Sequence, residues 1–364
     1  MRFLRDFITK FFFLLNFLAA LYALLVFQIS YAADIRHWLG GFLMLSIPFA
    51  FAINLFFLFT YAFSRSWKFV VSLVVLIIGY PLMERTLKFS LRSETELGDQ
   101  RLSVMSYNVM YLNHADRSDD GKALAARISN DLDTLRADIK CFQEIMNSPQ
   151  EPLFDTFDRL KKVNKHFTYM HSEIDPKSEF GAVGLATFSK YPIVAKKEIS
   201  WKINNNGVLI TDIKFKEDTV RVFNLQFKSM GIRVQKAITA DEIKRKQEAR
   251  NILSQLKSGF EDRALQVDQV EELIKESPYP VILAGDFNEL PYGYAYGRVR
   301  KELANAFEEA GFGFGFTYHK LPSFIRIDNI FFDSDKFEVL NFKTFNVLKG
   351  SDHYPIKASL KIRN

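Results

Sequence analysis

Cysteine is almost absent from this chain, because Cys141 is the only one among 364 residues. A single cysteine excludes an intramolecular disulfide and any metal site built on a Cys-x-x-Cys pair, and it leaves the redox compartment open. The sequence also lacks internal repeats and low-complexity segments. With 48% hydrophobic and 15% aromatic residues, it has enough apolar material for a sizeable core and for more than one structural unit.

The larger part of the chain has no excess of positive charge. The formal net charge of the whole sequence is +6. Residues 1–92 contain nine lysines and arginines against three acidic residues, whereas residues 93–364 contain 39 of each kind. A nucleic-acid-binding domain ordinarily has a basic footprint. The sequence therefore disfavours nucleic acid as a partner and indicates that the basic residues of the N-terminal quarter flank membrane segments.

Long uncharged runs occupy that N-terminal quarter. Residues 11–33 and 37–64 contain 23 and 28 residues without a formal charge, and a membrane-spanning helix needs about 20 apolar residues. We expect spans at about 11–33 and 39–63. The third run, 69–83, is short and forms a span at about 67–83 only if its flanking side chains reach the interface. A cleaved secretory signal is the alternative for the first run, but its length and the apolar runs after it disfavour this alternative.

Positive charges beside the spans predict an orientation. Arg2, Arg5 and Lys10 precede the first span, and Arg65 and Lys68 lie between the second and the third. Positively charged residues concentrate on the cytoplasmic side of spans. With three spans, these five residues lie on the cytoplasmic side and everything after Met83 lies outside the cytoplasm. With two spans, the predicted side of the domain is reversed. We expect a transmembrane anchor and linker over residues 1–92, and an extracytoplasmic domain over residues 93–364.

From about Leu102 onward, short β-rich runs alternate with amphipathic helical stretches, which is typical of an α/β domain with mixed sheets. The predicted strands cover residues 101–108, 139–143, 183–189, 209–215, 220–226, 280–284, 327–332, 337–345 and 356–362. The predicted helices cover residues 121–136, 151–161 and 294–311, with two more between 235 and 276. A single α/β unit can reach this length.

Polar side chains gather at the ends of the predicted strands. They are Asn108, Glu144, Asp286, Asn288, Asp328, Asp352 and His353. Strand ends deliver side chains to one rim of a sheet, so carboxylates converging there with a histidine predict a hard-cation site. Oxygen ligands suit Mg²⁺ or Mn²⁺ better than zinc. A lone carboxylate beside an apolar strand is costly, which favours a functional interpretation.

These residues belong to five short motifs whose order resembles the endonuclease/exonuclease/phosphatase superfamily, the DNase I-like metal-dependent phosphohydrolases. The motifs are a strand ending in Asn108, Q-E at 143–144, G-D-F-N at 285–288, R-I-D-N-I at 326–330 and S-D-H-Y-P-I at 351–356, together with A-T-F-S-K-Y-P-I at 186–193. One motif alone is weak, but the five in sequence are specific. The resemblance covers roughly residues 101–362 and implies a four-layer α/β/β/α sandwich, with the site where the two sheets open.

The resemblance implies a metal-binding group. Glu144 would ligate the catalytic Mg²⁺ or Mn²⁺, Asp352 would assist at the metal, and Asn108 would lie beside both the metal and the phosphate. Phosphoryl transfer depends on positioning and on neutralising charge, so a divalent cation with amide and imidazole donors is the equipment that it needs.

The resemblance also implies a catalytic group. Asp286 would orient and deprotonate the attacking water, while Asn288 would steady the phosphoryl oxygens. Asp328 would fix the tautomer of His353, whose other ring nitrogen would donate to the phosphate.

Two positions depart from the superfamily pattern. Gln226 ends the strand segment Asn224-Leu225-Gln226, where many lipid- and nucleotide-directed relatives have Asn-x-His. An amide can still donate a hydrogen bond to a substrate, but it cannot carry charge. Met110 stands where abasic-site nucleases tend to place an aspartate, which argues against a role in DNA repair.

A run of alternating glycines and phenylalanines lies outside these motifs, with Phe312, Phe314 and Phe316 between Gly311, Gly313 and Gly315. The glycines follow a predicted helix and indicate turns rather than a phosphate loop. Ordinary packing is the simpler interpretation of the phenylalanines, and a loop that dips toward lipid is the alternative.

Together these features predict a membrane-anchored, divalent-metal-dependent phosphohydrolase that cleaves a phosphoester. Several spans followed by such a domain also resemble bacterial membrane phosphatases of the teicoplanin-resistance type, whose substrates are expected to be lipid-linked phosphates. An anchor beside the domain raises the effective concentration of lipid substrates, which favours a lipid-linked phosphate or a phospholipid and makes the bilayer a partner. The alternatives are a phospholipase C-like or sphingomyelinase-like phosphodiesterase, a nuclease of the same superfamily, and a catalytically silent phosphate-binding domain.

Overall fold

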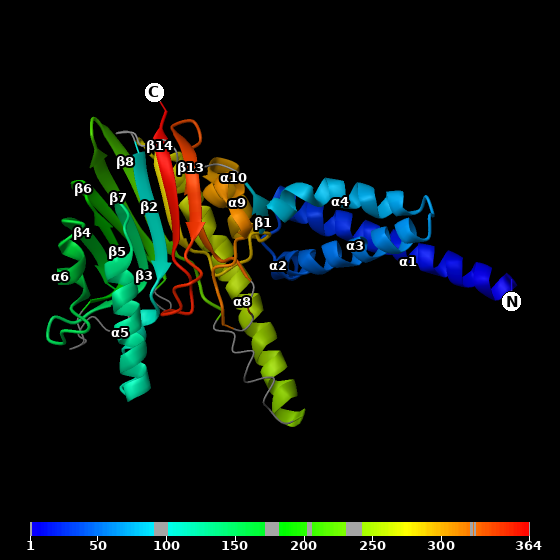
Figure 1. Ribbon diagram of the computed structural model, residues 1–364, viewed down its shortest axis with the longest axis horizontal. Coiled ribbons are helices and arrows are strands. Elements are labelled where there is room, and N and C mark those ends of the chain that lie inside the picture. The colour runs from blue at the N-terminus through cyan, green and yellow to red at the C-terminus, as the bar shows by residue number, and fades with distance from the viewer. Residues whose placement is uncertain are drawn as a thin grey trace.

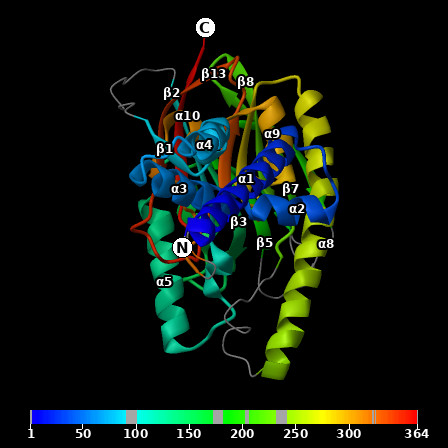
Figure 2. The ribbon, with the colours of Figure 1, turned by 90° about the vertical axis from the view of Figure 1, so that its right-hand side faces the viewer.

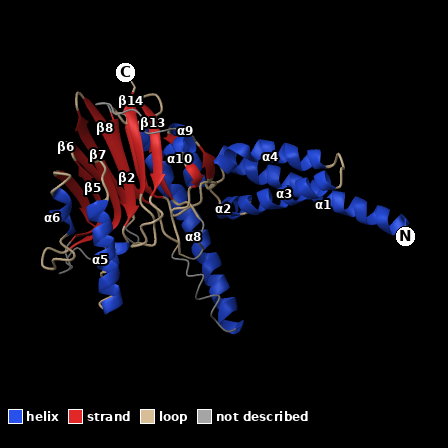
Figure 3. Cartoon of the chain, viewed as in Figure 1, coloured by secondary structure: helices blue, strands red, loops and turns tan. Residues whose placement is uncertain are grey.

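A helical bundle adjoins a sandwich of two sheets in the computed structural model of the chain (Figure 1). The structure describes residues 2–90, 101–171, 182–201, 206–230, 242–320, 323 and 325–363. Helices make up the bundle, and the strands lie together in the sandwich (Figure 3). The predicted linker residues 91 and 92 lie outside the described residues.

The bundle consists of four helices. They are α1 (Arg2–Ala32), α2 (Trp38–Leu45), α3 (Ile47–Phe63) and α4 (Phe69–Glu84). Two apolar helical segments, Phe3–Ala32 and Trp38–Phe63, are long enough to cross a membrane by length and composition. Helix α4 corresponds to the third expected span and has 16 residues, or about 24 Å at about 1.5 Å per residue, which is shorter than a bilayer core of about 30 Å.

Two six-stranded mixed sheets form the sandwich. The first has the order β13-β14-β2-β3-β5-β4, and the second has the order β10-β12-β9-β8-β7-β6. The strands of the first are β2 (Arg101–Asn108), β3 (Ile139–Asn147), β4 (His166–His171), β5 (Ala182–Ser189), β13 (Phe337–Thr344) and β14 (Ile356–Ile362). Those of the second are β6 (Ile193–Ser200), β7 (Gly207–Phe215), β8 (Asp218–Gln226), β9 (Val281–Asp286), β10 (Ala304–Asn305) and β12 (Asp328–Phe332). The pairs β2–β3 and β8–β9 are parallel, which makes both sheets mixed, as predicted.

Helices cover the outer faces of both sheets and complete four layers. Helices α5 (Asp119–Thr134) and α6 (Thr156–Lys161) pack on the first sheet, and α8 (Glu242–Lys275) and α9 (Tyr294–Glu302) pack on the second. Side chains alternate between faces along a strand, and β9 shows the result. Val281 and Leu283 belong to the core under α8 and α9, whereas Ile282 and Ala284 belong to the core between the sheets. The four-layer α/β/β/α prediction is confirmed.

The helices differ from the predicted ones in extent. From Glu242 on, one continuous helix α8 stands where two helices were expected, and residues 235–241 lie outside the described residues. The helix predicted over 294–311 is divided into α9 and α10 (Ala306–Ala310), because the two residues of β10 pair with β12. The Asn305 side chain then accepts from the amides of Phe307 and Glu308 and caps α10. The helix expected over 151–161 begins only at Thr156.

Strands β4 and β6 were not predicted from the sequence. Each is an edge strand, β4 of the first sheet and β6 of the second. The five residues of β6 from Val194 to Glu198 are exposed, with Lys196, Lys197 and Glu198 among them. Edge strands carry such charged residues against aggregation, and the charges hide the apolar alternation by which a strand is recognised.

The bundle and the sandwich share one hydrophobic core, which includes residues of α1, α3 and α4 as well as of α8, α9 and β9. Arg85, just after α4, is 3% exposed and donates to the carbonyl oxygen of Pro291 at 3.0 Å and to the hydroxyl of Ser30 at 3.3 Å. The Ser30 hydroxyl donates to the carbonyl oxygen of Tyr292 at 2.8 Å. The segment that follows β9 is therefore bonded directly to the bundle.

Close packing of β8 against β9 leads to a test by substitution. A β-carbon at Gly285 would overlap the backbone oxygen of Leu225 in β8, so Gly285→Ala should destabilise the protein by about 1–3 kcal/mol, as overpacking does. Gly259→Ala, in α8, is the control. Its β-carbon would meet side chains rather than backbone, with Cγ of Met230 at 2.8 Å and a guanidinium nitrogen of Arg263 at 3.2 Å. Alanine also favours a helix over glycine by about 1 kcal/mol. Thermal unfolding should show a lower Tm for the first variant only, and equal Tm values would contradict this register.

Candidate active site

Both sheets deliver polar residues to one end of the sandwich. Asn108 is the last residue of β2, Gln226 ends β8, Asp286 ends β9, and Asp328 begins β12. In the sheet register, Gln226 and Asp328 are the two neighbours of Asp286 on either side. The strand pairing alone therefore brings Gln226, Asp286 and Asp328 together, and Asn108 reaches them from the other sheet.

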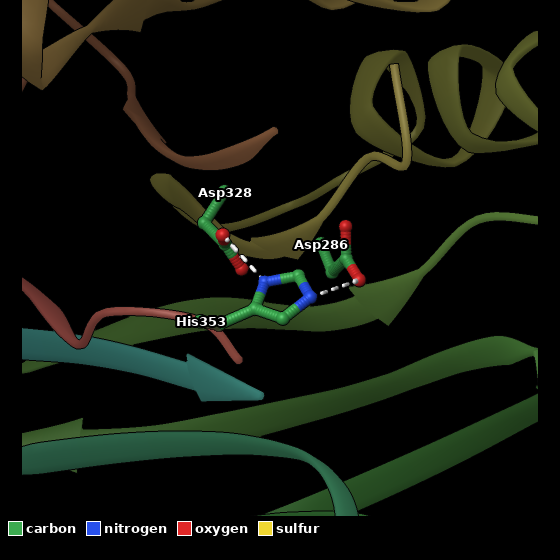
Figure 4. A group of neighbouring side chains, drawn as sticks. All are labelled: Asp286, Asp328 and His353. Atoms are coloured by element: carbon green, nitrogen blue, oxygen red, sulfur yellow. Dashed lines mark hydrogen bonds and ion pairs between the residues drawn. The ribbon is translucent and has the colours of Figure 1, made fainter. Parts of the chain in front are cut away.

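His353 lies between two buried aspartates (Figure 4). Its Nδ1 is 2.8 Å from Oδ2 of Asp328, and its Nε2 is 3.9 Å from Oδ2 of Asp286. The histidine is 5% exposed and each aspartate 1%. An ionised carboxylate can only accept a hydrogen bond. Nδ1 of His353 therefore carries the proton and donates a hydrogen bond to Asp328.

The pKa values of His353 and Asp286 are both raised. Burial by itself lowers the pKa of His353, but the carboxylates of Asp328 and Asp286 raise that pKa well above its ordinary value. Burial raises the pKa of Asp286 to about 7, although the charge of His353 acts in the opposite direction. A buried carboxyl group with so high a pKa is a stronger base than an ordinary aspartate.

Two asparagines hold the Asp286 carboxylate in place. The Asn108 amide donates to its Oδ2 at 3.1 Å. The backbone amide of Asn288 donates to Oδ1 at 2.8 Å, and its side-chain amide donates to Oδ2 at 3.1 Å and to the carbonyl oxygen of Phe227 at 3.0 Å. Asn288 has a φ of 49°, a left-handed conformation that asparagine tolerates better than most residues.

Glu144 is turned toward the site by an irregularity of β3. The pairing of β3 with β5 shifts between Phe142 and Ile145, and Glu144 has a φ of 49°. Gln226 donates to its Oε1 at 2.6 Å, and Asn108 is also hydrogen-bonded to it. The Glu144 side chain keeps partial access to solvent, although protein atoms surround its carboxylate. Burial of the carboxylate is the larger cause that raises the pKa of Glu144, and the negative charge of Asp352 is the second.

Asp352 completes the group from the turn before β14. The Ser351 hydroxyl is 2.7 Å from the carbonyl oxygen of Asn108 and 3.2 Å from Oδ1 of Asp352. Ser351 thereby joins the turn to the end of β2, and Asp352 is close enough to affect the pKa of Glu144. The structure thus brings all eight residues singled out from the sequence to one end of the sandwich.

The residues at this end suit a divalent cation. In the described part of the chain, the group of possible ligand atoms that lie within 4.8 Å of one another consists of Asp286, Asp328 and His353. This trio differs from the expected ligands, and two of its members already share a hydrogen bond. Glu144 and Asp352 repel each other, which a cation between them would relieve. Oxygen atoms dominate the donor set, as hard cations require.

Tyr318 and Thr317 belong to the site and were missed in the sequence. The ring of Tyr318 lies edge-on to His353 with 5.1 Å between centroids, and burial, then the charge of Asp352, raises its pKa to about 12. The Thr317 hydroxyl accepts from the backbone amides of Ile327 and Asp328, both at 3.1 Å. Bridges from Tyr318 to Ile325 and to His353 place this segment. The bridge to His353 joins residues far apart in the chain, so no local pattern identifies the contact.

Two buried amides connect the sheets beneath the site. The Asn224 amide donates to the carbonyl oxygens of Phe142 at 3.2 Å and Ala186 at 2.9 Å, and Gln143 donates to its Oδ1 at 2.8 Å. Asn224 lies in the second sheet and its three partners in the first. A polar residue within the apolar strand V-R-V-F-N-L-Q was the one signal in the sequence for this connection.

Comparison with known proteins extends the superfamily resemblance. The model of a family described as "Endonuclease/Exonuclease/phosphatase family" matches residues 105–353, and that of a domain of unknown function matches residues 9–86. No curated protein matches the chain.

Solved structures with the same fold include three with TM-scores of 0.50 or 0.51. The human nocturnin catalytic domain with bound sulfate is 16% identical, with 75% of this chain and 98% of that chain covered and a TM-score of 0.51. A family protein from Bacteroides thetaiotaomicron is 21% identical, with 72% and 98% covered and a TM-score of 0.51. One from Beutenbergia cavernae is 17% identical, with 72% of each chain covered and a TM-score of 0.50. Since the family model spans more than half of the sequence, this chain belongs to the endonuclease/exonuclease/phosphatase family.

Proposed function

We propose that the protein is a membrane-anchored, divalent-metal-dependent phosphohydrolase that cleaves the phosphoester of a lipid-linked phosphate or a phospholipid. The observation that carries the proposal is the line Asp328–His353–Asp286, which lies beside Glu144. In such a line the Asp286 carboxylate can accept a proton, and the imidazole of His353 can donate a hydrogen bond. The family to which the chain belongs consists of phosphoesterases and nucleases.

Asp286 acts on the attacking water in this proposal. The two asparagine amides fix its carboxylate, and burial raises its pKa to about 7. A base with a pKa near neutrality can take a proton from water, and a substantial fraction of it is still ionised at neutral pH. The Asn288 side-chain amide already donates to Asp286 and to the carbonyl oxygen of Phe227. These two bonds support a positioning role for Asn288 rather than a bond to the phosphoryl oxygens.

His353 donates to the phosphate in this proposal. Asp328 holds its Nδ1 proton, and the raised pKa of the imidazole favours a proton on Nε2 as well. Donors fixed in advance stabilise the charge that is redistributed in phosphoryl transfer. Gln226 is bonded to Glu144, so the amide that stands in place of a histidine orients a carboxylate.

Glu144, Asp352 and Asn108 would hold the cation, Mg²⁺ or Mn²⁺. The cation would supply positive charge at the phosphoryl oxygens. A nuclease is the rival within the family, and the balanced charge of residues 93–364 argues against it.

The course of the bundle supports an extracytoplasmic domain. Helix α1 runs toward the sandwich, α3 runs away from it and α4 returns, so the N-terminus and the turn between α3 and α4 lie at the far end (Figure 1). Arg2, Arg5, Arg65 and Lys68 are at that end or near it, and positive residues favour the cytoplasmic side. The bilayer would then be a partner that keeps the site beside lipid substrates.

Replacing Glu144 tests the metal assignment. Glu144→Gln should weaken Mg²⁺ binding by about tenfold or more, because a neutral amide replaces an anionic ligand. Glu151→Gln is the matched control, since Glu151 is bonded to Arg117 and His114 instead. Calorimetric titration of the detergent-solubilised protein measures the affinity, and an unchanged affinity in Glu144→Gln would remove Glu144 from the metal site.

Replacing the histidine and its partner tests the catalytic assignment. His353→Ala should lower turnover by about a hundredfold or more, with little loss of Tm, because it removes a donor to the transition state. Asp328→Asn should have a milder effect of the same kind, since it disturbs only the tautomer. His166→Ala, on the edge strand β4, serves as the control. The assay is Mg²⁺-dependent hydrolysis of lipid pyrophosphates, phospholipids, nucleotides and DNA.

Near-normal rates in both variants would mean that other residues form the catalytic group. If the parent protein hydrolysed none of these substrates with Mg²⁺ or Mn²⁺, the silent phosphate-binding alternative would replace the enzyme. Hydrolysis of DNA alone, with binding that weakens steeply in salt, would favour the nuclease.

Reporter fusions test the orientation. A reporter fused after Asn364 should behave as extracytoplasmic, and one inserted after Arg65 as cytoplasmic. With three crossings, the turn between α3 and α4 lies on the cytoplasmic side and the domain lies on the other side. Activity of the first reporter only in the cytoplasm would refute the third span or its direction.

A further inference from the structure

A two-stranded ribbon lies where the bundle meets the sandwich. It pairs β1 (Leu87–Phe89) with β11 (Phe312–Phe314) in antiparallel register, with Leu87 opposite Phe314 and Phe89 opposite Phe312. Backbone bonds from Ser90 to Gly311 and from Gly315 to Thr86 extend the ribbon at both ends. The ribbon is therefore an ordered element rather than a pair of loops.

One face of this ribbon is apolar and exposed. Side chains alternate between the two faces of a strand, so Leu87, Phe89, Phe312 and Phe314 share a face, while Lys88 lies on the other and pairs with Glu84 at 2.7 Å. Phe89, Phe312 and Phe314 are 66%, 68% and 61% exposed. We call these three residues the Phe face. Adjoining exposed aromatic rings on a folded protein mark an interaction surface.

The position of the Phe face indicates what covers it. Strand β1 begins three residues after α4 ends at Glu84. Figures 1 and 2 both show β1 beside the sandwich end of α4. The last turns of α4 expose Ile77 (63%) and Tyr80 (51%), side chains that face lipid if the bundle spans a bilayer. The ribbon thus lies next to an exposed apolar stretch of α4.

We propose that the Phe face lies in the interfacial layer of the bilayer, as a second attachment of the domain beside its helical anchor. The proposal rests on the membrane anchor proposed above and adds a contact to it. If the helical bundle were the only contact with the membrane, the tilt of the domain relative to the bilayer would be set only where the domain joins the bundle, near Arg85. Aromatic rings prefer the boundary between acyl chains and headgroups, so three of them on one side of the junction hold the domain in one orientation toward lipid substrates.

Site-directed spin labelling of the full chain in phosphatidylcholine vesicles tests this contact. Cys141 is completely buried, so a cysteine introduced at the surface is labelled selectively. Phe312→Cys places the label on the Phe face. Val194→Cys is the matched control, an exposed apolar residue (58%) on the edge strand β6 at the opposite side of the sandwich (Figure 1). Ile77→Cys reports on the anchor itself.

Collision of the label with oxygen, which concentrates in lipid, is compared with collision with a water-soluble nickel chelate. The ratio of oxygen to nickel accessibility should be several-fold higher at 312 and at 77 than at 194. A second label at Phe314→Cys should repeat the result and guards against a local effect of one substitution.

Three results would overturn the proposal. A ratio at 312 and 314 equal to that at 194, with a high ratio at 77, would place the Phe face in water while the anchor stands. A low ratio at 77 would instead refute the membrane anchor on which the proposal rests. Labels at 312 and 314 that are shielded from both reagents and broadened by a nearby label would show a second copy of the chain on this face.

Discussion

The need to keep several carboxylates together in a place with little water governs this structure. Ionised carboxylates repel one another and lose solvation when buried. The fold offsets both costs with fixed donors, namely an imidazole between two aspartates and amides from the ends of β2 and β8. The pKa values of Glu144 and Asp286 remain raised in spite of these donors. The remaining negative charge is what suits the site to a divalent cation. The carboxylates are Glu144, Asp286, Asp328 and Asp352.

The sandwich exists in a form that can hold this group because two sheets end at the same place. Asp286 receives its neighbours from strand pairing within one sheet, whereas Asn108, Glu144 and His353 come from the other sheet or the turn before it. A small relative movement of the sheets would separate them. The buried amide of Asn224, bonded across the gap to both β3 and β5, opposes that movement.

The anchor is part of the same mechanical unit. Arg85 binds the carbonyl oxygen of Pro291, five residues after Asp286, and its own carbonyl oxygen accepts a bond from Arg326, two residues before Asp328. The segments next to Asp286 and Asp328 are therefore both bonded to Arg85, the residue after α4. The guanidinium groups of Arg85 and Arg326 also lie over the ring of Tyr296, at 5.5 and 5.3 Å from its centroid.

The sequence by itself determined where the central strands lie along the chain and the residue types of the site. Alternating apolar residues mark β2, β8 and β14, and a polar residue such as Asn108 or Asp286 stands out at the end of an apolar strand. Local patterns do not identify edge strands such as β6, because the charged residues of such a strand face water. They also cannot state which amide bonds which carboxylate, or that Tyr318 lies against His353, because residues distant in the chain meet there only through sheet register. The tertiary structure alone decided these contacts, since each depends on the packing of two sheets rather than on its neighbours in sequence.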